Sequence, residues 1–86
     1  MLKVLIADDD VTPMEFVVWV LETVFDKSEE DAVRIMLQTH HEGSAECGVY
    51  PEARAQKLLA EAMAAARDNG HPLQFSVAQA SSSSSN

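Results

Sequence analysis

The residues best suited to binding or catalysis in this sequence are three consecutive acids, Asp8, Asp9 and Asp10, together with the histidine His40. Clustered carboxylate oxygens suit a hard divalent cation, a histidine near acids can act as a general base, and carboxylates can also hold a cationic ligand. The simplest alternative is a solvated turn that ends a strand and favours the N-terminus of the following helix. The neighbouring residues must decide between these interpretations.

Metal binding and catalysis are the less favoured interpretations. Consecutive acids on an extended chain point in different directions, and no metal-binding loop of known spacing follows them. No nucleophile has a positioned partner, because Cys47 lies in a strand-like segment beside Gly48, where a small buried residue is the simpler explanation. We therefore expect no enzymatic activity, no metal and no other cofactor.

Two neighbours of the acids favour a binding pocket instead. Met14 follows the acids closely, and helical spacing places His40 on the same face as Met36 and Leu37. A histidine on an apolar face is usually a hydrogen-bonded core residue, but near carboxylates and methionines it can equally border an apolar pocket with a polar mouth. Such a pocket fits a ligand with an ammonium group beside a hydrophobic side chain, as at the amino end of a polypeptide.

The first half of the chain is predicted to fold as a strand and two helices. Leu2–Ala7 is a short apolar run that suits a strand covered on both faces or nearly so. Thr12 is placed to cap a helix through Phe25, with Pro13 at its first position and Glu15 completing a capping box. Within that helix, Trp19 lies on a narrow polar stripe and is expected to be half exposed. A second helix runs from a Ser28 cap to Gly43.

The second half is predicted to add a strand over Glu46–Tyr50, a helix from Pro51 to about Asp68 and a strand around Leu73–Val77. The order strand, helix, helix, strand, helix, strand indicates an α+β domain, with a three-stranded antiparallel sheet packed against three helices. We expect one domain over residues 1–80. The Ser-rich tail, residues 81–86, is expected to be disordered, because it has nothing to bury against the entropy cost of order.

Composition limits the classes of partner. The formal net charge of -8 disfavours nucleic-acid binding, which depends on basic residues, and favours a cationic or basic partner. A single cysteine excludes an internal disulfide, and no secretory signal or membrane-spanning apolar run of about 18 residues is present. We expect a cytoplasmic protein without a membrane partner, and a monomer by default.

The sequence resembles the ClpS family of N-degron adaptors, which hand substrates with destabilising first residues to an AAA+ unfoldase, ClpA in many bacteria. The resemblance extends from about Leu2 to Val77. It rests on Asp9-Asp10-Val11-Thr12-Pro13-Met14-Glu15-Phe16-Val17-Val18, on Met36-Leu37 with His40, on Cys47-Gly48-Val49-Tyr50 and on His71-Pro72-Leu73. Together these segments are highly specific, whereas each alone is weak.

The resemblance implies a role for particular residues. Asp8, Asp10 and His40 would hold the α-amino group of the substrate, directly or through water, and Asp9 would add charge at the same rim. The first side chain of the substrate would enter a hydrophobic pocket lined by Ala7, Thr12, Met14, Val17, Met36, Thr39 and Leu73, with Met14 as the gatekeeper against β-branched residues. The unfoldase would dock near Glu52 and Lys57.

The chain departs from the usual family pattern at several positions. Asp8 stands where Asn is usual, Ala7 where a larger apolar residue is frequent, and Thr39 where Val is common. We therefore hypothesise a shifted or narrower preference among Phe, Tyr, Trp and Leu as first residues. Family members also usually carry an N-terminal extension used in delivery, whereas the first strand begins at Leu2 here, so a trimmed core and a different mode of delivery both remain open.

Other functions predict different behaviour. A protein-docking module similar to the C-terminal domain of the bacterial ribosomal stalk would need no terminal-amine pocket, and a metal-dependent enzyme would need a divalent ion. An apolar strand ending in acids also resembles the start of a bacterial receiver domain. A receiver needs a later phosphoacceptor aspartate, but no Asp occurs between Asp31 and Asp68, and the chain is too short for the receiver's strand–helix units.

Overall fold

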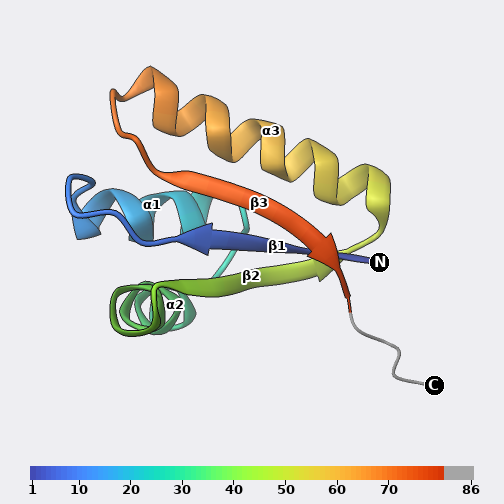
Figure 1. The fold of residues 1–86 in the computed structure, drawn as a ribbon, viewed down its shortest axis with the longest axis horizontal. Coiled ribbons are helices and arrows are strands. Elements are labelled where there is room, and N and C mark those ends of the chain that lie inside the picture. Colours follow the sequence, from blue (N-terminus) through green and yellow to red (C-terminus); the bar gives the residue numbers. More distant parts are fainter. Residues whose placement is uncertain (81–86) are drawn as a thin grey trace.

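The computed structural model describes residues 1–80, and its elements follow the predicted order. They are β1 (Leu2–Ala7), α1 (Met14–Thr23), α2 (Glu29–Glu42), β2 (Ser44–Tyr50), α3 (Glu52–Asp68) and β3 (Gln74–Gln79). The three strands form one antiparallel sheet in the order β2-β1-β3 (Figure 1). The α+β class and the antiparallel sheet are therefore confirmed. The predicted disorder of residues 81–86 concerns a segment outside the described residues.

The central strand β1 alternates between a buried and a partly exposed face. Leu2, Val4 and Ile6 are buried in a core shared with all three helices, whereas the intervening side chains are only partly covered. Successive side chains of a strand point to opposite faces of its sheet. The prediction of a strand covered on both faces or nearly so therefore holds fully for the core face, whereas the other face is only partly covered.

The acidic turn lies at one end of the sheet, and both ends of the described chain, residues 1 and 80, lie at the other. Figure 1 shows the loop between β1 and α1 at one end, and the described start and end of the chain at the other. Helix α1 packs on α2, α2 on β2, and α3 mainly on β3 and β1. This packing of α1 on α2 places the acidic turn beside α2.

Within residues 1–80, no helix combines the length and apolar character needed to cross a membrane.

Helix α1 begins one residue later than predicted and ends earlier. Its N-cap is Pro13, without a side-chain cap, and its last residue is Thr23 instead of Phe25. The Thr12 hydroxyl does not cap the helix because it donates a hydrogen bond to the Asp9 carboxylate. The predicted capping box is therefore wrong. Trp19 is 46% exposed, which confirms the predicted half exposure.

Helix α2 has the predicted caps but a different buried face. The Ser28 hydroxyl accepts a hydrogen bond from the Asp31 N–H at 3.1 Å, and Gly43 ends the helix with a φ of 89°. Its fully buried residues are Ala32, Ile35 and Thr39, whereas Leu37 and His40 are exposed. Met36 packs against the core as predicted, but Leu37 and His40 do not, so the apolar face predicted over Val33, Met36, Leu37 and His40 is shifted by about one helical position.

Strand β2 contains a bulge at Cys47. Val4 pairs with Gly48 and Leu5 with Glu46, so Cys47 is an extra residue between the two pairs. The Cys47 side chain is 1% exposed, as expected for a small core residue, and this burial raises the pKa of its thiol to about 12. A protonated, enclosed thiol is structural and not nucleophilic.

Gly48 is required by the close approach of Tyr50. A Cβ at position 48 would lie 2.7 Å from Cζ of the Tyr50 ring, which also faces Arg54 with 5.8 Å between guanidinium carbon and ring centroid.

We expect Gly48→Ala to lower the free energy of unfolding by about 1–3 kcal/mol, because the overpacked ring must move. Chemical denaturation of Gly48→Ala, Tyr50→Ala and the double variant tests this. An equal cost of Gly48→Ala with and without the ring would contradict the explanation.

Candidate functional site

A pocket lies between the acidic turn, the start of α1 and the second half of α2. Its volume is about 130 Å³, smaller than the roughly 300–1,000 Å³ of sites for drug-sized ligands. It is lined by Asp8, Asp9, Asp10, Thr12, Met14, Val17, Met36, Thr39 and His40. These residues are distant in sequence, and the fold brings together all the predicted pocket residues except Ala7 and Leu73.

The remaining predicted site residues lie elsewhere. Ala7 is the last residue of β1 and pairs with Ser44 and Gln74, and Leu73 is a core residue that is 6% exposed. Neither of these lines the pocket. Glu52 and Lys57 are exposed on α3, which begins at the end of the sheet opposite the acidic turn (Figure 1). The predicted docking residues are therefore separate from the pocket.

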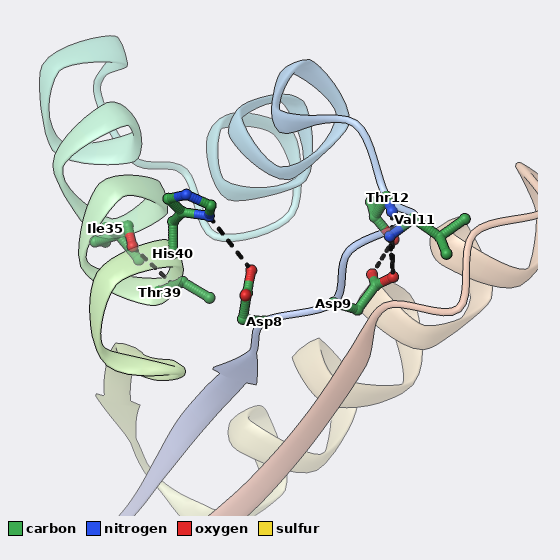
Figure 2. Close-up of polar contacts among 7 residues, drawn as sticks. All are labelled: Asp8, Asp9, Val11, Thr12, Ile35, Thr39 and His40. Atoms are coloured by element: carbon green, nitrogen blue, oxygen red, sulfur yellow. Dashed lines mark hydrogen bonds and ion pairs between the residues drawn. The ribbon is translucent and has the colours of Figure 1, made fainter.

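Asp8 and His40 face each other at the pocket mouth (Figure 2). The distance from Asp8 Oδ1 to His40 Nδ1 is 4.0 Å, and the two side chains are 32% and 53% exposed. The Asp8 N–H donates to the Gly43 carbonyl at 2.9 Å, which ties the end of β1 to the end of α2. A separation of 4.0 Å is too long for a direct hydrogen bond, so both polar atoms can contact a third group at the mouth.

Asp9 points away from Asp8 and towards its own turn (Figure 2). Its Oδ1 accepts hydrogen bonds from the backbone N–H groups of Val11 at 2.8 Å and Thr12 at 3.2 Å, and its Oδ2 accepts one from the Thr12 hydroxyl. The Thr12 hydroxyl, with smaller contributions from the two N–H groups and His71, lowers the pKa of Asp9 below its ordinary value. The divergence of neighbouring acids expected from the sequence is therefore present.

Thr39 forms part of the pocket wall, and its hydroxyl already has a hydrogen-bond partner inside α2. Its side chain is 3% exposed, and its hydroxyl donates to the Ile35 carbonyl one turn earlier at 2.8 Å. Because that bond stays within α2, the pocket does not have to supply a partner for the hydroxyl proton. Together with Met14, Val17 and Met36, Thr39 leaves the interior of the pocket largely apolar.

An aromatic cluster supports the start of α1 from outside the pocket. The Phe16 ring packs on His71 with 4.5 Å between centroids and on Trp19 with 5.6 Å. These contacts join α1 to the connection between α3 and β3. In the sequence, Phe16 and His71 stand in two separate segments that resemble the family, and no local pattern shows that they meet. All the residues that line the pocket itself had been predicted.

The pocket has the chemistry of a binding site. Among residues 1–80, no group of three or more His, Cys, Asp or Glu side chains is arranged to hold a metal ion. Carboxylates and an imidazole line the pocket together with methionine, valine and threonine side chains. Fold and pocket together define a small α+β domain built to bind a ligand that has a polar end and an apolar end.

Comparison with known proteins gives the family. Residues 1–76 match the family model described as ATP-dependent Clp protease adaptor protein ClpS, and the chain belongs to this family. This confirms the resemblance found in the sequence. The family consists of adaptors of the Clp protease and not of proteases.

Individual relatives agree with this assignment. The chain is 53% identical to the ClpS adapter of Caulobacter vibrioides (strain NA1000 / CB15N) over 75 residues, which cover 87% of this chain and 69% of the relative. It is 45% identical to that of Shewanella loihica over 80 residues, covering 93% and 78%. It also resembles the solved structure of Agrobacterium tumefaciens ClpS2 bound to L-phenylalaninamide, with a TM-score of 0.86, 38% identity, and coverage of 90% and 93%.

Proposed function

We propose that this protein is a cytoplasmic, monomeric adaptor for N-degron substrates. It binds the free α-amino group and the bulky hydrophobic first residue, Phe, Tyr, Trp or Leu, and delivers the substrate to a ClpA-type AAA+ unfoldase. The observation that carries the proposal is the apolar pocket with Asp8 and His40 facing each other across its mouth. The ligand of the Agrobacterium relative, an amino-acid amide with a free amine and an aromatic side chain, supports it.

The interior of the pocket provides the hydrophobic part of the binding energy. Burying an aromatic side chain of roughly 150–250 Å² at about 25 cal/mol/Å² contributes about 4–6 kcal/mol before the costs of association. Met14 is 50% exposed at the rim, and its flexible thioether can adapt to different side chains. The pocket can thus accept several large first residues while giving little energy to glycine.

The mouth of the pocket recognises the charged amine. An ammonium group has three N–H donors, and Asp8, Asp10 and a neutral His40 imidazole offer acceptors around the same opening. Each charge-assisted hydrogen bond contributes about 1.5–3 kcal/mol. Asp8 in its ionised form accepts only, so the hydrogen bond that Asn can donate to the peptide carbonyl is lost here.

Peptides that differ only in their first residue test this function. A peptide starting with Phe is expected to bind, and the same peptide starting with Gly or Val is not, as measured by fluorescence anisotropy or calorimetry. A chelator should leave the affinity unchanged. Binding that ignores the first residue would favour the docking-module alternative, and binding that a chelator abolishes would favour a metal-dependent protein.

Delivery is proposed to use the other end of the domain. Glu52 and Lys57 lie on α3, which begins opposite the acidic turn, so substrate and unfoldase can be held at the same time. The double variant Glu52→Ala/Lys57→Ala should therefore weaken association with the unfoldase while leaving the affinity for a Phe peptide unchanged. A parallel loss of both activities would contradict this separation.

The internal hydrogen bond of Thr39 gives a prediction about specificity. Because its hydroxyl donates to the Ile35 carbonyl, Thr39→Val should keep the shape of the pocket and change affinities for Phe, Tyr, Trp and Leu peptides by less than about threefold. Ala7, another of the three departures, does not line the pocket. A reordering of the four affinities in Thr39→Val would support the shifted preference hypothesised from the sequence.

A further inference from the structure

The three acids of the turn do not have the same surroundings. All three line the pocket, but Asp8 faces His40 and Asp10 is exposed, whereas the Asp9 carboxylate accepts hydrogen bonds from its own turn. We propose that Asp9 is a positioning residue that closes the turn over residues 9–12 and thereby sets Asp10 and Thr12 against the pocket, without itself binding the α-amino group. This inference rests on the proposed function of the pocket.

The hydrogen bonds of Asp9 account for most of what its carboxylate can accept. A carboxylate offers about four lone-pair sites, and the N–H groups of Val11 and Thr12 and the Thr12 hydroxyl occupy three of them. In Figure 2 the Asp9 carboxylate points towards Thr12 and the Asp8 carboxylate towards α2. An ammonium held between Asp8 and His40 therefore finds only about one acceptor position left on the Asp9 carboxylate.

The turn closed by Asp9 leads directly into the pocket wall. Pro13 follows it with a fixed φ of -63°, and helix α1 starts at Met14, so the shape of the turn determines where the first turn of α1 lies. Met14 and Val17 of that first turn line the pocket. Releasing the turn would thus displace Asp10 and loosen the apolar wall together, although Asp9 contacts neither the first side chain nor the amine.

The positioning role can be separated from a charge role by one substitution. In Asp9→Asn the amide oxygen can still accept from both N–H groups, and the amide nitrogen can donate to the Thr12 hydroxyl oxygen, which both donates and accepts. The turn is retained while the negative charge is removed. In Asp9→Ala both the turn and the charge are lost.

The experiment compares the affinities of a Phe-initiated peptide for the full chain and its variants. Asp9→Ala is expected to weaken binding roughly 10- to 100-fold, and Asp9→Asn is expected to recover most of that loss. At Asp10 the contrast is expected to be reversed, because its carboxylate lines the pocket and is proposed to contact the amine directly, so Asp10→Asn should recover little of the loss in Asp10→Ala. Denaturation curves of all four variants show whether the fold is kept.

A measurement without peptide tests the turn itself. Amide hydrogen exchange at Val11 and Thr12 should accelerate in Asp9→Ala and stay slow in Asp9→Asn. Equal loss of affinity in Asp9→Asn and Asp9→Ala, or unchanged affinity or exchange in Asp9→Ala, would overturn the inference. If the unmodified protein does not bind the peptide, the proposed function fails, and amide exchange still decides whether Asp9 closes the turn.

Discussion

A Phe-initiated peptide with an acetylated α-amino group is expected to bind at least about 100-fold more weakly than the same peptide with a free amine. Acetylation removes the positive charge and leaves a single N–H donor in place of three. It also leaves the carboxylates of Asp8 and Asp10 partly desolvated without a cation at the pocket mouth. Competition against a labelled Phe peptide measures the difference.

Chemical variants of the amine separate the effects of charge and donors. A dimethylated α-amino group keeps its charge but has one N–H donor, so its peptide should bind between the free and acetylated forms. A peptide amidated at its far end is the matched control and should bind like the parent, because the proposed site takes only the amino end. Equal affinity of acetylated and free peptides would rule out recognition of the amine.

The elements could be predicted where local chemistry decides the structure. The apolar run of β1, the Ser28 cap and Gly43 at the end of α2 all specify their conformations through nearest neighbours, and the structure agrees with each. One wrong prediction concerns a residue with two possible hydrogen-bond partners. Thr12 could cap α1 or bond Asp9, and its sequence position does not reveal that the Asp9 carboxylate is the partner.

Some residues of the site could be predicted from their types alone, and others only from the family resemblance. The acids, Met14 and His40 suggested an anionic mouth over an apolar pocket from residue types alone, whereas the roles of Val17, Met36 and Thr39 came from the family resemblance. Helical periodicity placed His40 on the core face, but Thr39 occupies the buried position, so His40 lies exposed at the mouth. A shift of one residue rotates a side chain by about 100° around a helix, which periodicity does not resolve when both neighbours are polar.

Removing both carboxylates that have acceptors free for the ammonium should nearly abolish binding. In Asp8→Ala/Asp10→Ala, the loss of two charge-assisted hydrogen bonds of about 1.5–3 kcal/mol each should weaken binding of a Phe peptide roughly 100- to 10,000-fold. Both side chains lie at the pocket mouth, and neither is part of the hydrophobic core. The free energy of unfolding should therefore change little, as measured by chemical denaturation.

The matched control removes the same number of charges elsewhere. Glu46 and Glu61 are exposed on β2 and α3, and neither lines the pocket. If the overall negative charge of the domain attracted the peptide, Glu46→Ala/Glu61→Ala would weaken binding as much as the turn variant, and both losses would vanish in high salt. If the amine is held by direct contacts, the control keeps its affinity, and the turn variant remains weak at every salt concentration, because contacts at the pocket mouth are screened less than distant surface charges.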